Sequence, residues 1–199
     1  MDLLVATNNL GKLGELLQLL GDAPVNLFSL RDIGDFTEVE ETGPTFEENA
    51  ALKATGYALQ TGKWTIADDS GLEVAALNGR PGVFSARYAG ADTPYSEKNR
   101  LLLAEIEQTG DRERLARFVS AVAIADPTGA IRFTAEGLCR GHIAREPRGS
   151  NGFGYDPIFV PDGFDRTFGE LSARIKEQIS HRARATVKII ADLRNFLYA

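Results

Sequence analysis

The stretch IADDSGLEV, residues 66–74, sets two adjacent aspartates against an apolar run and decides how the chain around it is interpreted. Trp64–Ala67 predicts a buried strand, and charge at the end of such a strand costs free energy unless something uses it. Ser70-Gly71 predicts a turn, which places Asp68 and Asp69 at the carboxyl end of the strand, where open α/β sheets hold their sites. Adjacent residues of an extended chain point to opposite sides, so we expect the two carboxylates to have different roles. An Asx-type turn is the structural alternative, although it needs only one aspartate.

Short apolar runs alternate with helical patterns in the first part of the chain. Leu3–Val5 and Val25–Leu30 predict two strands. Between them, leucines at helical spacing predict a helix that Gly21 ends. A second helix is predicted to begin at a capping box with Thr45 as its N-cap and to end at Gly62.

The second part of the chain predicts a helix, a long hairpin and a final helix. Thr93-Pro94 begins the first of these, with the proline at the first helical position. Residues 115–125 and 130–139 flank a turn signal at 126–129, which is typical of an antiparallel hairpin. Ser180 is the predicted N-cap of the last helix, whose expected apolar face is Val187, Ile190, Leu193, Phe196 and Leu197. The alternation of helices and strands predicts a mixed α/β fold.

Composition and charge narrow the class of protein. The chain has 199 residues, of which 43% are hydrophobic and 25% charged, which is typical of one globular domain. Its single cysteine excludes an internal disulfide, and two histidines are too few for a histidine-rich zinc site. A net charge of −6 argues against general nucleic-acid binding. The chain shows no secretory signal and no apolar run of the roughly 20 residues that a membrane helix needs, so we expect a cytoplasmic protein.

The segment ATNNLGK, residues 6–12, leads from the first predicted strand into the first predicted helix. A helix N-terminus offers backbone N–H groups and a positive dipole, which suit an anion. Thr7 and Asn9 add side-chain hydrogen bonds, and Lys12 adds a positive charge. The Walker spacing is absent, so the segment predicts either a phosphate cradle of another kind or an ordinary turn capped by asparagine.

An acidic segment follows at Glu38, Glu40 and Glu41. It is interpreted either as a solvated loop or as the source of one glutamate that joins an aspartate on a hard divalent cation. Mg²⁺ suits such a set, because it takes one or two protein carboxylates and completes its shell with waters and substrate phosphates. Lys53, on the following helix, is either a site residue or a surface lysine.

Two glycine-rich loops carry aromatic and basic side chains. Residues 79–90, GRPGVFSARYAG, include Arg87, which is either a ligand contact or a structural ion pair. Residues 150–159, SNGFGYDPIF, alternate glycines with Phe153 and Tyr155. This second loop suits either a purine stacked on an aromatic face or an aromatic anchor packed in the core.

A basic cluster lies near the predicted start of the last helix. Such a cluster suits a phosphate chain or a purine carbonyl, and a solvated helix face is the alternative. Its members are Lys176, His181, Arg182 and Arg184.

In their order and spacing, these segments together resemble the inosine triphosphate pyrophosphatase family, also described as the Ham1-like non-canonical purine NTP pyrophosphatases. The resemblance extends over nearly the whole chain and is strongest to the bacterial branch. The matching pieces are Thr7-x-Asn9-x-x-Lys12, Glu40-Glu41-Thr42-Gly43, Thr45-Phe46-x-Glu48-Asn49-Ala50, Ala67-Asp68-Asp69-Ser70-Gly71-Leu72, Pro81-Gly82-Val83-Phe84-Ser85-Ala86-Arg87-Tyr88, Gly152-Phe153-Gly154-Tyr155-Asp156-Pro157 and Ile179-Ser180-His181-Arg182.

The resemblance implies a fold and a reaction. The fold would be a long, mixed, twisted β-sheet flanked by helices, with two lobes around a central cleft in a single domain over residues 1–199. The protein would be a homodimer. It would hydrolyse dITP, ITP and XTP to the monophosphate and pyrophosphate with Mg²⁺, and so remove deaminated purines from the nucleotide pool.

The resemblance also implies roles by position. Glu40 and Asp69 would hold the metal, Asp69 would be the general base for a metal-activated water, and Asp68 would be either a second ligand or an orienting group. His181 and Arg182 would read the purine edge, and Phe153 would stack on the base. The implied substrate-binding residues are Thr7, Asn8, Asn9, Leu10, Gly11, Lys12, Ser70, Phe153, Gly154, Tyr155, Asp156, Lys176, His181 and Arg182, with Lys53 and Arg87 as further candidates.

Two alternatives remain beside this interpretation. A Maf-like nucleotide pyrophosphatase would share the early strand, turn and lysine, but would not be expected to carry the Gly-Phe-Gly-Tyr-Asp and Ser-His-Arg segments. A non-catalytic purine nucleotide sensor would bind without turnover, and would not need a general base beside a set of metal-binding carboxylates.

Overall fold

The computed structural model describes residues 1–21 and 23–198. Its strands are β1 (Asp2–Val5), β2 (Asn26–Ser29), β3 (Trp64–Val74), β4 (Leu115–Ala125), β5 (Ile131–Ile143) and β6 (Phe159–Pro161). Its α-helices are α1 (Leu10–Leu20), α2 (Phe46–Thr61), α3 (Tyr95–Thr109), α4 (Ala173–Ile179) and α5 (His181–Tyr198). Short 3₁₀ helices lie at Leu30–Asp32, Ala75–Leu77, Gly82–Arg87 and Asp156–Ile158.

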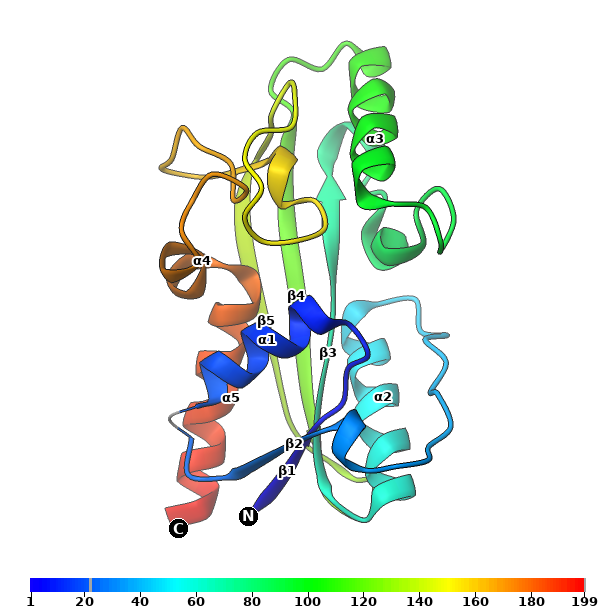
Figure 1. The fold of residues 1–199 in the computed structure, drawn as a ribbon, viewed down its shortest axis with the longest axis vertical. Helices are drawn as coiled ribbons and strands as arrows, with labels where there is room; N and C mark the ends of the chain where they lie inside the picture. Colours follow the sequence, from blue (N-terminus) through cyan, green and yellow to red (C-terminus); the bar gives the residue numbers. More distant parts are fainter. Residues whose placement is uncertain (22, 199) are drawn as a thin grey trace. The chain divides into compact units, whose positions relative to one another are not determined.

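The described strands form one six-stranded sheet in the order β2-β1-β3-β4-β5-β6 (Figure 1). β1 runs parallel to β2 and β3, whereas β5 and β6 are antiparallel. The predicted mixed α/β fold is therefore confirmed. Val5, the last residue of β1, pairs with Ile66 of β3, and the Ala6 N–H donates to the Ile66 carbonyl at 2.8 Å. β1 thus ends just before the point where β3 reaches its aspartates.

The chain divides into two compact units. Unit 1 comprises residues 1–69, 120–137 and 181–199, and unit 2 comprises residues 70–119 and 138–180. Three of the dividing points fall inside β3, β4 and β5, so each of these strands contributes residues to both units.

The core of unit 1 lies between the sheet and the helices α1 and α5. Leucines of α1 pack there with Ile189 and Leu193 of α5 and with strand residues that include Ile66. The predicted apolar face of α5 is wrong at Val187, which is 63% exposed, whereas the Phe196 ring packs on the Trp64 ring with centroids 5.3 Å apart. The buried stripe of α5 instead runs through residues spaced by four, which keeps them above one another on the helix.

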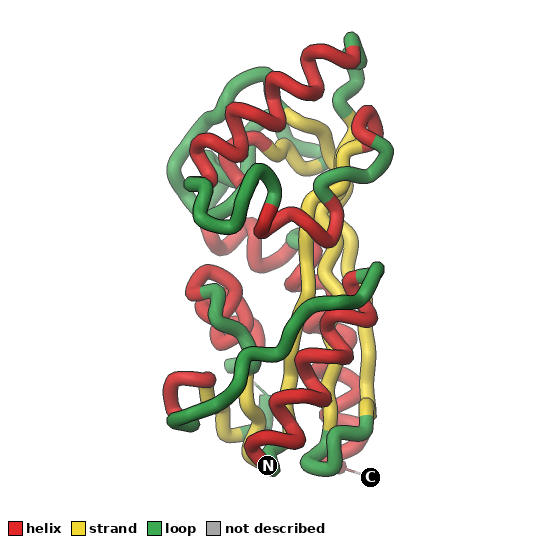
Figure 2. Tube along the Cα trace, turned by 90° about the vertical axis from the view of Figure 1, so that its right-hand side faces the viewer, coloured by secondary structure: helices red, strands yellow, loops and turns green. Residues whose placement is uncertain are grey.

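The acidic loop between β2 and α2 runs beside α2 (Figure 2). Thr37 exchanges hydrogen bonds with the side-chain amide of Gln60, at 2.7 and 3.0 Å. The Val39 N–H donates to the Tyr57 hydroxyl at 3.4 Å. The helix also makes room for the loop, because a Cβ at Gly56 would lie 2.6 Å from a methyl group of Val39. These contacts hold the acidic loop along α2.

Unit 2 has its own apolar core. It gathers residues of β3, α3, β4, β5 and β6 with the loop that follows β6. The core includes Leu72, Val74, Leu102, Ile106, Phe118, Ile143, Tyr155, Phe159 and Phe168. The Phe159 and Phe168 rings are stacked with centroids 5.5 Å apart.

The predicted turn at Ser70-Gly71 is wrong. β3 continues through Asp68 and Asp69 to Val74, so both carboxylates lie inside a long strand rather than at its end. The capped start of α2 at Thr45 is confirmed, since its side chain accepts a hydrogen bond from the backbone three residues on. Pro94 is the N-cap of α3 rather than its first residue. The helix α4 was not predicted, because seven residues are too few for a periodic signal.

Two glycine-to-alanine substitutions should change stability in opposite directions. Alanine is the better helix former by about 1 kcal/mol, so Gly14→Ala in α1 should raise the free energy of unfolding, since no described atom outside the neighbouring residues and the backbone of α1 lies within 4 Å of the added Cβ. Gly56→Ala in α2 should lower it by about 1 kcal/mol or more, because the new methyl group displaces Val39. Urea unfolding of both variants tests this, and equal stabilisation would contradict the described packing of the loop on α2.

Candidate functional site

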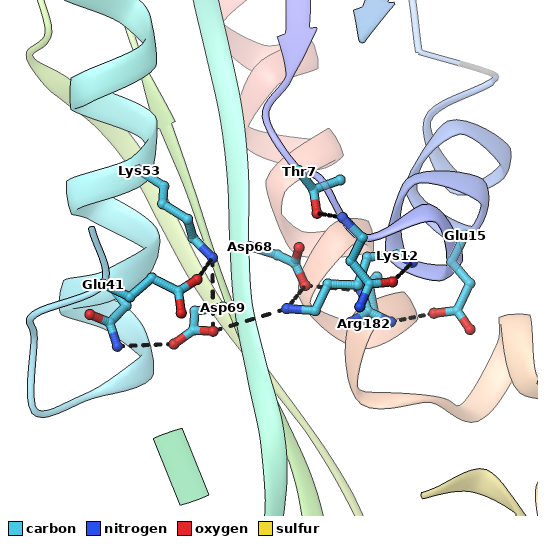
Figure 3. A network of polar contacts seen from close by, with 10 residues as sticks. Thr7, Lys12, Glu15, Glu41, Lys53, Asp68, Asp69 and Arg182 are labelled. Carbon is cyan, nitrogen blue, oxygen red and sulfur yellow. Dashed lines mark hydrogen bonds and ion pairs between the residues drawn. The ribbon is translucent and has the colours of Figure 1, made fainter. Parts of the chain in front are cut away.

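β3 presents its two aspartates to different surroundings in unit 1 (Figure 3). Asp68 points toward α1 and α5, and Asp69 points toward α2. Both are buried, with 0% and 4% of their surfaces exposed. The expectation that neighbouring carboxylates point to opposite sides is confirmed, and it follows from the two-residue period of a strand.

Asp68 is held by cations. Arg182 donates from Nε to Asp68 Oδ2 at 3.0 Å, and the Lys12 ammonium lies 3.5 Å from the same oxygen. Burial alone would raise the pKa of Asp68, but the attraction of Lys12 and Arg182 outweighs it and holds the pKa well below its usual range. Among the described residues, no group donates a hydrogen bond to the other oxygen, Oδ1.

Arg182 depends on a close approach between α5 and β5. A Cβ at Gly137 would lie 2.1 Å from the His181 carbonyl oxygen, so only glycine lets the first turn of α5 approach the strand this closely. Arg182 is buried there and also pairs with Glu15 of α1. A solvated helix face is therefore wrong for His181 and Arg182, which are both buried, and it describes Arg184, which is exposed.

Asp69 has a different set of neighbours. The Asn49 amide donates to Asp69 Oδ2 at 3.1 Å, and the Lys53 ammonium lies 3.8 Å from Oδ1. Lys53 also pairs with Glu41 at 2.5 Å, and only 12% of its side chain is exposed, so it is not a surface lysine. Its role in the site stays a prediction. Burial raises the pKa of Asp69, and the charge of Glu41 adds to this against the opposing pull of Lys53 and Lys12.

The structure brings one acidic side chain of the loop to the aspartates. It is Glu41, which shares Lys53 with Asp69. Glu40 is exposed, and Glu38 accepts a hydrogen bond from the Asn8 amide at 3.3 Å. The metal-binding role of Glu40 stays a prediction, and Glu41 is the glutamate that the loop places near the aspartates.

The segment that leads into α1 is an asparagine-capped turn. The Asn9 side chain accepts a hydrogen bond from the Lys12 N–H at 3.1 Å, and the Thr7 hydroxyl accepts one from the Asn9 N–H at 3.2 Å. Leu10 and Gly11 are the first two helical residues, and N–H groups at this position have no acceptor within the helix. The turn is therefore well defined, and its anion-binding role stays a prediction.

A second group of predicted residues lies in unit 2, in residues 152–156, which we call the recognition loop. Asp156 is buried and accepts hydrogen bonds from the Phe153 N–H at 2.7 Å and from the Lys176 ammonium at 2.5 Å. The Lys176 ammonium also lies 4.6 Å from the centre of the Phe153 ring. Gly152 has a φ of +71°, and a Cβ there would lie 2.0 Å from Asp156. The loop can therefore close on its own carboxylate only with glycine at this position.

The remaining predicted residues differ in their surroundings. Tyr155 packs in the core of unit 2, and its hydroxyl donates to the Ser85 carbonyl at 2.9 Å. Tyr155 is therefore an aromatic anchor packed in the core, which was one of the two interpretations of this loop from the sequence. Arg87 is exposed, with its guanidinium 5.1 Å from the centre of the Phe84 ring. Ser70 is half-buried on β3.

Sequence analysis did not predict two residues that contact the aspartates and cations of unit 1. Asn49 is fully buried and holds Asp69, while its own Oδ1 accepts the Gly43 N–H at 2.7 Å. A polar residue on the inner side of a capped helix was the available signal. Glu15 lies one helical turn after Lys12, and this spacing could have suggested that the two side chains share a face.

Substituting the two neighbouring aspartates should affect stability very differently. Asp68→Asn leaves Lys12 and Arg182 as buried cations that have lost a partner, so it should lower the free energy of unfolding by about 3–5 kcal/mol. Asp69→Asn removes a carboxylate whose ionised form is disfavoured by burial, and should change it by less than about 1 kcal/mol. Chemical denaturation at neutral pH gives both values.

The pH dependence provides a check on the same pair. The pKa of Asp68 is lower in the folded than in the unfolded chain, so its stabilisation is complete above the unfolded value of about 3.9 and is lost as the pH falls further. The difference between the wild type and Asp68→Asn should therefore shrink below about pH 4. A difference that does not change with pH, or equal effects of the two substitutions, would contradict this assignment.

Comparisons with known proteins agree with these observations. The family model described as the Ham1 family matches residues 3–192. A dITP/XTP pyrophosphatase of Desulforamulus reducens is 47% identical over 198 residues, covering 100% of this chain and 98% of that protein. A dITP/XTP pyrophosphatase of Bacillus licheniformis is 48% identical, covering 96% of both. No helix within the described residues is long and apolar enough to cross a membrane.

The fold is also shared with solved structures. A HAM1 protein from Coxiella burnetii has a TM-score of 0.90 at 41% identity, covering 98% of this chain and 99% of that one. The Ham1 protein of Staphylococcus aureus has a TM-score of 0.86 at 39% identity, covering 98% and 99%. Since the family model, the relatives and the structures each cover nearly the whole chain, this protein is a member of the Ham1 family.

Proposed function

We propose that this chain hydrolyses the non-canonical purine nucleoside triphosphates dITP, ITP and XTP to the monophosphate and pyrophosphate. Membership of the Ham1 family and full-length similarity to proteins named dITP/XTP pyrophosphatase support the reaction. The observation that carries the proposal is the pair of buried carboxylates on β3, one bound by cations and the other facing α2. A binding protein has no need of the second carboxylate.

The cations of unit 1 suit a triphosphate. Attack on a phosphate requires that its charge be neutralised and that the reacting groups be held in line. Lys12 lies in the first turn of α1, whose N–H groups and positive dipole suit an anion, and its ammonium lies 3.5 Å from Asp68 Oδ2. We assign the triphosphate to Thr7, Asn8, Asn9, Leu10, Gly11 and Lys12, with Ser70 as a further contact.

Asp69 is the residue that we assign as general base. A carboxylate with a raised pKa accepts a proton more readily than an ordinary aspartate. Its orientation is set by Asn49, which holds Oδ2 and leaves Oδ1 facing Lys53 and Lys12. Asp69 therefore withdraws a proton from the attacking water, and Asp68 serves as the anchor of Lys12 and Arg182.

The donor set suits Mg²⁺. No group of three or more His, Cys, Asp or Glu side chains within the described residues forms a ready-made metal cage. Mg²⁺ needs only one or two protein carboxylates when phosphates and waters complete its shell. Asp69 with Glu40 or Glu41 would hold it, and Asp68 Oδ1 is a further buried acceptor. When bound, it would neutralise phosphate charge and acidify the attacking water.

The recognition loop and the start of α5 are assigned to the base. Phe153 offers an aromatic face for stacking, and Asp156 with Lys176 fixes the loop that carries it. A donor from His181 or Arg182 would favour a 6-oxo purine over adenine. The carboxylates on either side of Arg182 hold its guanidinium in place for such a contact.

The same proposal covers the setting of the enzyme. Both units, residues 1–199, act as a single domain, the active protein is a homodimer, and it works in the cytoplasm without nucleic acid or membrane. There it would remove deaminated purines from the nucleotide pool. The support for these statements is the family resemblance.

A substrate panel tests the function. The purified chain with Mg²⁺ at slightly alkaline pH should release pyrophosphate rapidly from ITP, XTP and dITP, and slowly from ATP, GTP and dTTP. Asp69→Asn should remain folded and lose turnover by about two orders of magnitude or more, because it cannot take the proton of the water. Pyrophosphate and orthophosphate are measured separately, so that the bond broken is known.

Two results would redirect the assignment. Equal turnover of all six nucleotides would favour a Maf-like pyrophosphatase of different specificity. Binding of ITP without turnover by the wild type would favour a nucleotide sensor. If Asp69→Asn turned over ITP as fast as the wild type, Asp69 would not be the general base.

A further inference from the structure

Asn99 of α3 has no role in the reaction described above, yet it holds the recognition loop. Its side chain is 3% exposed, and its Nδ2 donates to the Gly154 carbonyl at 3.2 Å. Gly154 has a φ of +67° and lies between the side chain that we assign to the base, Phe153, and the core anchor Tyr155. The loop is therefore tied to α3 at its midpoint.

The other half of the Asn99 amide is unsatisfied. Its Oδ1 is buried, and no donor among the described residues reaches it. A buried acceptor without a hydrogen bond costs more free energy than one ordinary hydrogen bond returns. Leucine has the same number of side-chain heavy atoms, is also branched at Cγ and is the better helix former, so it would fill this position without leaving a buried acceptor unsatisfied. Stability alone therefore does not explain an asparagine at this position.

The face of α3 around Asn99 is directed at the same loop. Tyr95 lies one turn earlier, and its ring meets the Tyr155 ring edge-on with centroids 5.4 Å apart. An added Cβ at Gly154 would lie 3.6 Å from the Tyr95 ring. Lys98, beside Asn99, donates to the Ala86 carbonyl. Lys98 therefore binds a different segment, whereas Tyr95 and Asn99 hold the recognition loop from outside and Asp156 closes it from inside.

We infer that Asn99 is a positioning residue that fixes the Gly154 carbonyl and thereby sets the selectivity of the enzyme among purine bases. The inference rests on the proposed function, because it takes the recognition loop as the part that receives the base. Its physical basis is that a loop held at its midpoint presents Phe153 and Asp156 in one arrangement. A released loop would adapt to bases with different edges and so discriminate less.

The first test measures the loop without any substrate. Hydrogen exchange of the peptide covering residues 151–158 should become roughly five- to tenfold faster in Asn99→Leu, which is the change expected for one lost hydrogen bond. Asn195→Leu is the matched control, since Asn195 is an exposed residue of α5 in unit 1. The exchange of this peptide should be unchanged in the control.

The second test measures selectivity and stability together. In Asn99→Leu the ratio of kcat/KM for ITP to that for GTP should fall roughly five- to tenfold, mainly through KM, while the melting temperature stays at or above that of the wild type. A merely structural residue would lower the melting temperature and weaken both substrates alike. If the leucine variant does not fold, Asn99→Ala removes the same donor without adding bulk or a buried charge, and it should show the same changes in exchange and in the ITP to GTP ratio.

The outcomes separate this inference from the proposed function. Unchanged exchange in a folded Asn99 variant would overturn the inference, and so would faster exchange with an unchanged ITP to GTP ratio. Phe153→Ala tests whether the recognition loop receives the base. It should raise KM for ITP more than it lowers kcat if Phe153 stacks on the base. Failure of the wild type to hydrolyse ITP would overturn the proposed function, whereas the exchange experiment would still report whether Asn99 anchors the loop.

Discussion

A buried negative charge at Asp68 organises unit 1. Lys12 at the start of α1 and Arg182 at the start of α5 both face this carboxylate, which is fully buried on β3. Three elements that are far apart in the sequence therefore meet at one charge. The arrangement is costly to disturb, because loss of the carboxylate would take one partner from each of the two cations. The site can hold cations in a fixed place only because Asp68 remains ionised.

Asp69, the next residue of β3, has its pKa shifted in the opposite direction from that of Asp68. Asp69 is buried beside Asn49 and Lys53, and burial raises its pKa while the pKa of Asp68 is lowered. Two adjacent carboxylates are thus separated in their acid–base properties by the faces of one strand. Such a separation fits the proposed roles, in which Asp68 is used for structure and Asp69 for proton transfer.

The features that could be predicted from the sequence are those set by interactions between neighbouring residues. The Thr45 cap, the hairpin at 126–129 and the opposite directions of the two aspartates follow from neighbouring residues alone. The continuation of β3 through the aspartates could not be predicted from neighbouring residues. Asp68 is stabilised inside the strand by Arg182, which lies 114 residues away in the sequence. Glu41 rather than Glu40 lies beside Lys53 because of the way the acidic loop packs on α2, and no local sequence pattern predicts that packing.

We propose separate roles for the two aspartates, with Asp69 at the reacting phosphate and Asp68 as the anchor of the cations. Anomalous diffraction from crystals grown with Mn²⁺ and a non-hydrolysable ITP analogue tests it most directly, because Mn²⁺ can replace Mg²⁺ on oxygen ligands. We expect a metal peak coordinated by Asp69 and a glutamate of the acidic loop, with Asp68 still paired to Lys12 and Arg182. A metal coordinated by Asp68, with Asp69 outside its shell, would contradict it.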